Sequence, residues 1–386
     1  MPNIVPIVRA IESINTPDNR PLPDMIAMLG RPAPTSITEL LLRLEGIDMP
    51  LRLDVGRPHG RAYAAILAQL GQHSQFVYLD VDEAAKPWEI ANVSVADIVR
   101  VRELKSYPWG DIDVFLQPSS VRHVLKRESP RFAESYALLV AALADNEYVA
   151  VTESERLGEI SHVFRSDKRI SPFSARCTIE PPPAVMKTTN EIIHLVTKHS
   201  VDEAQQLFLA MHDLACDPNA IDALCTPFAY PHSGCETRAH QMCERLLVDH
   251  SAVAAKIYLY ASGTTESGFL SPKTPNDPAC VVNWVYHVAP LVRIRTSAGG
   301  DWRVVDPALF RKDEAVPTID QWRGRQRDAN ARFVITESAL YDRRPDGVIQ
   351  RDHWDPRFCY APEVLAKYRA ALIQQIETAK GPPPYC

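Results

Sequence analysis

The sequence has no apolar run that could span a bilayer and no surplus of positive charge. Its longest apolar stretch, near residues 136–144, is far shorter than the roughly 20 residues that a membrane helix needs. The 48 Asp and Glu residues outnumber the 42 Lys and Arg residues, so the net charge is −6 and nothing in bulk attracts nucleic acid or anionic lipid. We therefore expect neither a membrane nor a nucleic acid as a partner.

A secretory signal is also missing, because Arg9 and Glu12 appear before any apolar segment develops. The sequence contains no CxxC pair, HExxH motif, P-loop or dinucleotide-binding glycine pattern, and glycine itself is scarce at 15 residues. The sequence therefore contains no recognised motif for a metal, a nucleotide phosphate or a dinucleotide. Without a signal, the eight cysteines indicate reduced thiols in a cytoplasmic protein, unless a signal-less route exports the chain.

What is present is an ordinary globular composition, with 46% hydrophobic and 23% charged residues in a chain of 386. A proline run at 181–183 marks a provisional boundary between an N-terminal region, 1–180, and a second region, 185–380. A second run, at 382–384, indicates a flexible tail over 381–386.

The N-terminal region has the pattern of an additional mixed α/β domain. A helix is predicted after Pro130, and strands are predicted over 76–82, 96–104, 112–117 and 148–153. The region carries no chemical motif. It is interpreted as an accessory domain or as a regulatory segment that covers the downstream site.

The second region contains the most informative stretch, PHSGCETRAHQMCERLLVDH at 231–250. Ser233 and Glu236 have the spacing of a capping box, which predicts a helix that begins just after Ser233 and carries Cys235 in its first turn. Backbone N–H groups at a helix start lower the pKa of a thiol, and they can also stabilise an oxyanion. Cys235 is therefore a candidate nucleophile.

An apolar stripe along the same helix turns Cys235 toward a sheet. Its members are Ala239, Met242, Cys243, Leu246 and Leu247. This pattern fits a buried structural cysteine as well as a nucleophile. A zinc site built from His232, Cys235, His240 and Cys243 is disfavoured, because a five-residue spacing on a helix points Cys235 and His240 roughly 140° apart.

A hairpin is predicted over 281–310, with its turn at 297–300. His287 lies toward the start of the first strand and Asp306 at the end of the second, where Pro307 stops the ladder. The two positions fall at the same end of an antiparallel hairpin. A carboxylate there can hold the imidazole in one tautomer and stabilise the imidazolium. Spacing alone leaves open whether His287 is a buried core histidine, and whether Cys235, His287 and Asp306 converge.

Together these stretches resemble the bacterial protein-glutamine glutaminases (protein glutaminases). The blocks that carry the resemblance are GCxxRAHxM at 234–242, WxYHVAxLV at 284–292 and DPxLF at 306–310, in that order. Weaker similarity continues through Trp322 and the stretch 331–341, so the resemblance covers residues 220–345.

The resemblance implies a role for each matching residue. Cys235 corresponds to the nucleophile, His287 to the general base and acid, and Asp306 to the carboxylate that orients the histidine. Trp284 and Tyr286 are expected to contact the substrate or to support the site. The implied fold is α+β, with a papain- or transglutaminase-like core in which the cysteine helix packs on an antiparallel sheet. The implied reaction hydrolyses the side-chain amide of glutamine in a peptide or protein, through a thioester and without a cofactor.

The chain departs from the family in ways that put its substrate in question. Members are typically secreted precursors with disulfides, whereas this N-terminal region is longer and unlike theirs. A Ser/Thr/Pro-bearing insertion lies at 261–278, and Pro290 is expected to interrupt the strand after His287. A thioester could also react with an amine, so an amide-forming acyltransferase or ligase acting on a small acyl or amine substrate remains the alternative. A non-catalytic binding protein is a third interpretation.

Overall fold

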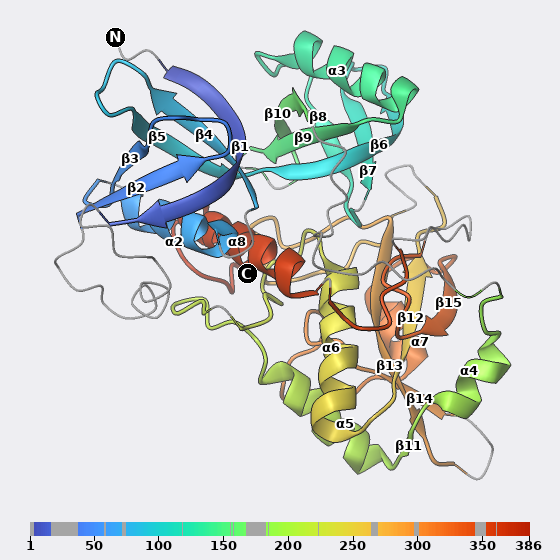
Figure 1. The fold of residues 1–386 in the computed structure, drawn as a ribbon. Coiled ribbons are helices and arrows are strands. Elements are labelled where there is room, and N and C mark those ends of the chain that lie inside the picture. Colours follow the sequence, from blue (N-terminus) through green and yellow to red (C-terminus); the bar gives the residue numbers. More distant parts are fainter. Residues whose placement is uncertain are drawn as a thin grey trace.

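The structure of the chain is a computed structural model. It describes residues 4–16, 38–57, 59–71, 75–117, 119–154, 156, 158–166, 183, 185–222, 224–263, 269–296, 301–343, 353–359 and 361–386. Three sheets lie side by side, and helices cover them (Figure 1). Among these residues, no helix combines the length and apolar character that crossing a bilayer requires.

The first sheet is a small closed barrel with the strand order β1-β2-β3-β5-β4. Its strands are β1 (Ile4–Asn15), β2 (Glu39–Leu44), β3 (Leu51–Asp54), β4 (Phe76–Asp82) and β5 (Glu89–Val95). Every second residue of β2 is a buried leucine, Leu40, Leu42 and Leu44, and these side chains fill the barrel, while helix α2 (Gly60–Gly71) packs beside it. The strand predicted over 76–82 coincides with β4.

The second sheet has the order β10-β9-β6-β7-β8 and carries helix α3 (Phe132–Asp145) on one face. Its strands are β6 (Asp97–Ser106), β7 (Ile112–Gln117), β8 (His123–Leu125), β9 (Tyr148–Glu153) and β10 (Ile160–Arg165). The helix predicted after Pro130 and the strands predicted near 96–104, 112–117 and 148–153 are all present. The N-terminal region, expected to be one mixed domain, therefore builds two separate sheets.

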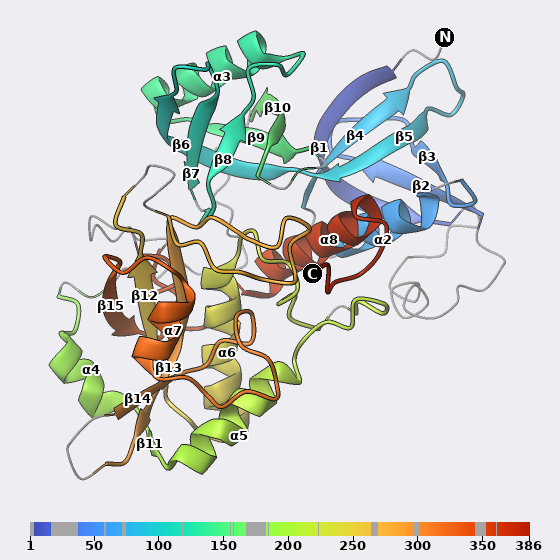
Figure 2. The same cartoon turned by 180° about the vertical axis from the view of Figure 1, so that it is seen from behind.

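The third sheet has the order β11-β13-β12-β15, with β14 paired to β13 (Figure 2). Its strands are β11 (Lys198–His199), β12 (Ala255–Tyr260), β13 (Tyr286–Ile294), β14 (Asp301–Val304) and β15 (Arg332–Glu337). Its helices are α4 (Thr189–Leu195), α5 (Val201–His212), α6 (Cys235–His250) and α7 (Ile319–Arg325). Helix α6 packs on β13, whose residues are all buried. The pairs β12–β13, β12–β15 and β13–β14 are antiparallel.

Strand β13 continues through Pro290, so the expected interruption of the strand there is wrong. Pro290 lies opposite Lys256 of β12, and its carbonyl accepts a hydrogen bond from the Val305 N–H at 2.9 Å. Proline removes only the donor at its position, and the acceptor still serves the next strand. The predicted hairpin is formed by β13 and β14, and its turn at 297–300 lies outside the described residues.

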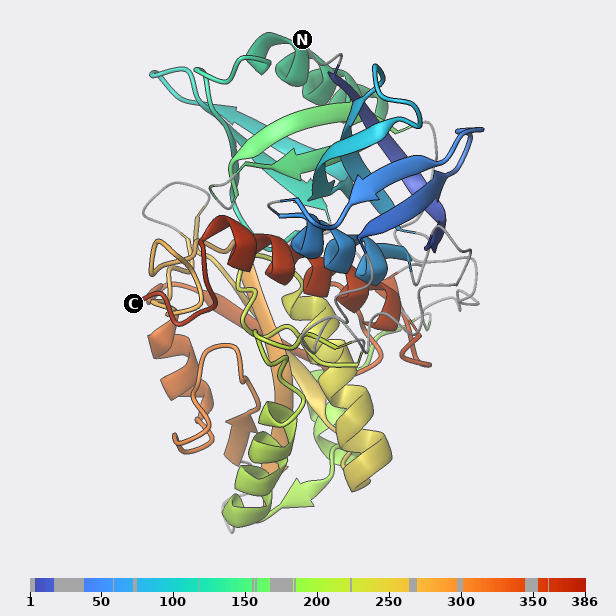
Figure 3. The ribbon, with the colours of Figure 1, turned by 90° about the vertical axis from the view of Figure 1, so that its left-hand side faces the viewer.

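The C-terminal helix α8 (Ala361–Thr378) joins the second region to the N-terminal barrel (Figure 3). Ala370 is part of the barrel's buried cluster. The Arg369 Nε donates to the Gln69 side chain at 2.9 Å, and the Val95 N–H donates to the Gln374 side chain at 2.9 Å. A boundary drawn near residue 180 therefore divides the sequence, but the barrel shares its core with a helix from the other end of the chain.

The expectation of reduced thiols is wrong for most of the described cysteines. Cys216 is bonded to Cys225, Cys280 is bonded to Cys386, and Cys359 is also in a disulfide. The fold brings these cysteines together from separate segments, which spacing along the chain could not reveal. Cys177 lies outside the described residues.

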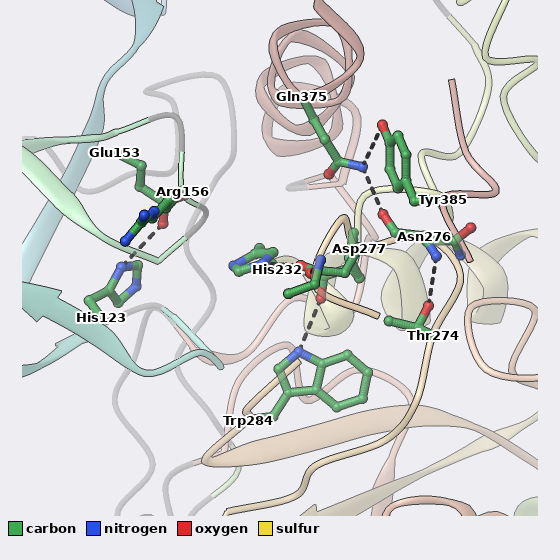
Figure 4. Close-up of polar contacts among 12 residues, drawn as sticks. His123, Glu153, Arg156, His232, Thr274, Asn276, Asp277, Trp284, Gln375 and Tyr385 are labelled. Atoms are coloured by element: carbon green, nitrogen blue, oxygen red, sulfur yellow. Dashed lines mark hydrogen bonds and ion pairs between the residues drawn. The ribbon is translucent and has the colours of Figure 1, made fainter. Parts of the chain in front are cut away.

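The chain end is attached at several points in place of the flexible tail that the sequence indicates (Figure 4). Cys386 is bonded to Cys280, and the Tyr385 N–H donates to the Pro275 carbonyl at 2.7 Å. The Gln375 amide donates to the Tyr385 hydroxyl at 3.4 Å and to the Asn276 carbonyl at 2.8 Å.

The two disulfides should differ in their effect on stability. The Cys280–Cys386 bond joins residues 106 apart, and the Cys216–Cys225 bond joins residues 9 apart. Because a longer loop loses more entropy on closure, removing the first pair (Cys280→Ser with Cys386→Ser) should lower the free energy of unfolding by ~4 kcal/mol. Removing the second pair should cost ~2 kcal/mol. Denaturant titration measures both, and equal losses would contradict the assignment.

Candidate active site

Helix α6 begins at Cys235 without the capping box that the sequence predicts. Its N-cap is Gly234, in the left-handed conformation at φ 83°, and no side chain caps the helix. A Cβ at Gly234 would lie 2.2 Å from the ring of Tyr368, so only glycine fits between α6 and α8. The predicted capping box from Ser233 to Glu236 is therefore wrong, and Glu236 is free for another contact.

The apolar stripe of α6 faces the interior, with one exception. Cys235, Ala239, Met242, Cys243 and Leu246 are buried, whereas Leu247 is 42% exposed. Cys235 is a free thiol and belongs to a buried, mainly aromatic cluster that includes Tyr258 and Phe269. The cysteine side chain thus lies between the helix start and β12–β13, as the stripe predicts.

The environment of the Cys235 thiol does not lower its pKa, contrary to the expectation from the helix start. Burial, and next the charge of Glu236, raise the pKa of the thiol well above its ordinary value. Arg238, a hydrogen bond from Ser120 and one from the backbone of Val288 act in the opposite direction without outweighing burial. In this state of the chain, the sulfur is therefore a neutral thiol.

His287 and Asp306 are in direct contact. The His287 Nε2–H donates to Oδ2 of Asp306 at 2.8 Å, and the Trp322 indole N–H donates to the same oxygen at 2.7 Å. The Ala308 N–H donates to Oδ1 at 3.2 Å. Burial alone would raise the pKa of Asp306, but the charge and hydrogen bond of His287 and the hydrogen bond of Trp322 lower it below its ordinary value.

Two tryptophans hold the ring of His287. The ring centroids of Trp284 and His287 are 4.3 Å apart, and those of His287 and Trp322 are 5.7 Å apart. The Trp284 indole donates to the Pro231 carbonyl at 3.0 Å, which ties this tryptophan to the loop before α6 (Figure 4). His287 Nδ1 is buried and has no hydrogen-bond partner among the residues that the structure describes. It is the nitrogen left for proton transfer.

Tyr286 and Glu236 meet beside the sulfur. The Tyr286 hydroxyl donates to Oε2 of Glu236 at 3.4 Å, and the Cys235 thiol donates to the same oxygen at 3.4 Å. Sequence reasoning named Tyr286 but assigned Glu236 to a helix cap. The spacing of Ser233 and Glu236 indicates a capping box, but spacing does not tell that the N-cap of α6 is Gly234 in the left-handed conformation.

A segment of the N-terminal region pairs with the residues just before β13. Val121 forms an antiparallel bridge with Trp284, and the Val285 N–H donates to the Ser120 carbonyl at 2.8 Å. Ser120 and Val121 are 1% and 2% exposed. The sequence carries no signal that could have found Ser120, because its partner is more than a hundred residues away in the chain.

The other histidines and cysteine of the 231–250 stretch have separate partners. His232 Nε2 contacts Asp277 Oδ2 at 2.7 Å, and His240 Nε2 contacts Asp355 Oδ2 at 3.0 Å. Lys256 donates to Nδ1 of His240 at 2.7 Å. Within the described part of the chain, no group of three or more His, Cys, Asp or Glu side chains is arranged to hold a metal ion.

Comparison with protein families gives one match to this part of the chain. Residues 204–326, which carry Cys235, His287, Asp306 and Trp322, match a family described as glutaminase. The resemblance predicted from the motif blocks is thereby confirmed over this stretch. The comparison with curated proteins gives no match.

Solved structures with some similarity to the chain are protein-glutaminases. A crystal structure of pro-protein-glutaminase is 21% identical and covers 71% of this chain and 92% of that chain, with a TM-score of 0.47. A mutant of that protein gives 20% identity and the same TM-score, 0.47. The NMR structure of protein-glutaminase from Chryseobacterium proteolyticum is 26% identical and covers 44% of this chain and 86% of that chain, with a TM-score of 0.36.

The lowered pKa of Asp306 makes its contribution to stability depend on pH. A depressed folded-state pKa stabilises the protein above the unfolded value of about 3.9, and this stabilisation is lost as pH falls through the folded-state value. At neutral pH, Asp306→Asn should lower the free energy of unfolding by ~3 kcal/mol, because it leaves the buried His287 unpaired. The difference from wild type should shrink below about pH 4.

Urea titrations of both proteins across this pH range measure the difference in the free energy of unfolding. Asp48→Asn, at an exposed position, is the control, and a pH-independent difference would contradict the assignment.

Proposed function

We propose that the chain is a cysteine-dependent amidase that deamidates glutamine side chains in peptides or proteins through a thioester. The observation that carries this proposal is the buried His287–Asp306 pair, in the same family-matching stretch as the free thiol of Cys235. Nδ1 of His287 has no hydrogen-bond partner among the described residues. A histidine held by a carboxylate on one nitrogen is a general base on the other.

In the proposed reaction, His287 takes the proton of Cys235, and the thiolate attacks the carboxamide carbon. The C–S bond forms while the carbonyl electron pair moves onto oxygen. Collapse of this intermediate breaks the C–N bond, and His287 gives its proton to the departing ammonia. His287 then removes a proton from water, which hydrolyses the thioester to the glutamate product and restores the thiol. Asp306 stabilises the imidazolium in both halves of the reaction.

The papain- or transglutaminase-like core remains part of this proposal. It is supported by the packing of α6, with Cys235 at its first position, on the antiparallel strands β12 and β13. His287 comes from β13, and Asp306 lies two residues after the end of β14, the strand that pairs with β13. Such a strand positions His287 more rigidly than a loop would.

We further propose that the N-terminal region keeps the site covered. Residues 120–122 pair with 283–285 as an added strand, and the Ser120 side chain hydrogen-bonds the Cys235 sulfur. Both the burial and the neutral thiol described above belong to this covered arrangement. An extended segment laid beside Trp284 and Val285 occupies backbone groups that a peptide substrate could use instead. The region is thus proposed to be regulatory rather than only accessory.

Displacing this cover should expose the nucleophile. Val121→Asp places a charge in a fully buried position and should detach the 120–122 segment, because an unpaired buried charge costs several kcal/mol. Alkylation of Cys235 by iodoacetamide, followed by peptide mass mapping, should become at least about tenfold faster. Val140→Asp on the exposed face of α3 is the matched control. Equal rates in wild type and Val121→Asp would contradict the proposal of a cover.

Product analysis tests the reaction itself. The wild-type chain, the Val121→Asp chain and the Val121→Asp chain with Cys235→Ala are incubated with a capped glutamine peptide. Only the Val121→Asp chain should release ammonia strongly, with a gain of about one dalton in peptide mass, because the leaving group must depart from a thioester on Cys235. Ammonia with a larger mass gain in the presence of an amine would support the acyltransferase alternative. No ammonia from a chain whose Cys235 alkylates readily would overturn both enzymatic proposals.

A further inference from the structure

Glu236 is a buried carboxyl group beside the nucleophile, and neither the helix cap nor the proposed mechanism uses it. Its side chain is 0% exposed, in the first turn of α6. Oxygen Oε2 accepts from the Cys235 thiol and from the Tyr286 hydroxyl, each at 3.4 Å. Oxygen Oε1 is buried and has no hydrogen-bond partner in the described part of the chain. A fully buried carboxyl oxygen with no donor in reach is costly for a carboxylate. In the neutral acid, an O–H at this oxygen has no acceptor in the described part of the chain and is free to donate to a bound molecule.

The groups that face Glu236 favour its neutral form. Burial raises the pKa of Glu236, and the charge of Asp342, in the loop after β15, raises it further. The backbone N–H of Glu236 itself, the charge of Arg238 and the hydrogen bond from the Cys235 thiol oppose this effect without reversing it.

Two further elements place a cation within electrostatic reach of Glu236, Lys256 on β12 and Lys367 on α8. Each of these cations has a nearer partner, His240 for Lys256 and Asp97 for Lys367. The remaining titratable groups around Glu236 are four buried tyrosines, Tyr258, Tyr286, Tyr341 and Tyr368. Burial raises the pKa of each of them, so they stay neutral and add no charge to the site.

Proton transfer from Cys235 to His287 strengthens the preference of Glu236 for its neutral form. Once the sulfur is a thiolate, a second negative charge on the adjacent Oε2 would be repelled at short range, so the proton stays on the carboxyl group. The same holds when negative charge moves from sulfur to the substrate oxygen. A neutral acid is a strong hydrogen-bond donor to a developing oxyanion. It makes a short hydrogen bond, and because the acid is uncharged, no charge of its own has to be desolvated.

We infer that Glu236 is a further catalytic residue, a carboxylic acid whose O–H donates a hydrogen bond to the carbonyl oxygen of the substrate as that oxygen becomes negative. Tyr286 holds Oε2 and so orients the acid. No proton is transferred in this step: the thiolate forms the C–S bond, the carbonyl electron pair moves onto oxygen, and the O–H of Glu236 stays intact. The inference rests on the proposed deamidation, since it assigns a role within that reaction.

Infrared spectroscopy tests the protonation state without relying on activity. The full chain is labelled with ¹³C-glutamate, and the spectrum of Glu236→Gln is subtracted from that of wild type. The C=O band of a protonated carboxylic acid should persist at about pH 6, where an ordinary glutamate with a pKa of about 4.3 is ionised. A difference spectrum that shows only carboxylate bands at that pH would overturn the inference.

Kinetics in the Val121→Asp chain test the role. Glu236→Ala should lower kcat for the glutamine peptide by about 10²–10³-fold with little change in KM, which is the loss seen when one oxyanion donor is removed. Glu236→Gln should stay within about tenfold of the parent, because its amide N–H can still donate, and it should lose the decline at alkaline pH that ionisation of Glu236 causes. Glu244→Gln, a half-buried glutamate on the same helix, is the matched control and should change neither kcat nor the pH profile.

The outcomes separate this inference from the function on which it rests. An active parent chain in which Glu236→Ala keeps its kcat would overturn the inference alone. The inference also falls if Glu236→Gln and Glu236→Ala lose activity equally with an unchanged pH profile, since that would indicate a packing role. A parent chain that releases no ammonia would overturn the proposed function, and the infrared difference spectrum would then decide the state of Glu236 by itself.

Discussion

The site depends on one buried pair, the imidazole of His287 and the carboxylate of Asp306. Asp306 is 2% exposed and His287 is 1% exposed, so neither can find another partner in water. A carboxylate in such a place is stable only because His287, Trp322 and a backbone N–H surround both of its oxygens. These hydrogen bonds to Asp306 hold the end of the β13–β14 hairpin and helix α7, which carries Trp322, in place. They also keep the ring of His287 between two tryptophans. The unpartnered Nδ1 of His287 follows from the same arrangement.

The surroundings of Cys235, the proposed nucleophile, disfavour its charged form, whereas those of Asp306 favour the charged form. Cys235 stands at a helix start, where backbone dipoles favour a thiolate, yet burial raises the pKa of its thiol. The segment at 120–122, which we propose as the cover, forms a bridge to Trp284 next to the strand that carries His287. Helix α8 packs on α6, α2 and β5, so one helix contacts both the barrel region and the helix that carries Cys235.

Much of this could be predicted from local patterns. The strands β4, β7 and β9 begin and end where runs rich in β-branched and aromatic residues indicate, and His287 and Asp306 meet because strand pairing brings hairpin ends together. Contacts between distant segments could not be predicted. The disulfides, the bridge from Val121 to Trp284 and the barrel core completed by Ala370 depend on tertiary packing, which residue spacing does not encode. The capping box failed for a related reason, because Tyr368 of α8 requires glycine at the N-cap.

Trapping the covalent intermediate tests the account most directly. The Val121→Asp chain is mixed with a glutamine peptide, quenched in acid within its first turnovers and digested for mass spectrometry. The account predicts that the peptide containing Cys235 gains the mass of the substrate less ammonia, and that Asp306→Asn reduces its amount. Release of ammonia with the adduct on a different residue, or with Cys235 unmodified at every quench time, would contradict the account.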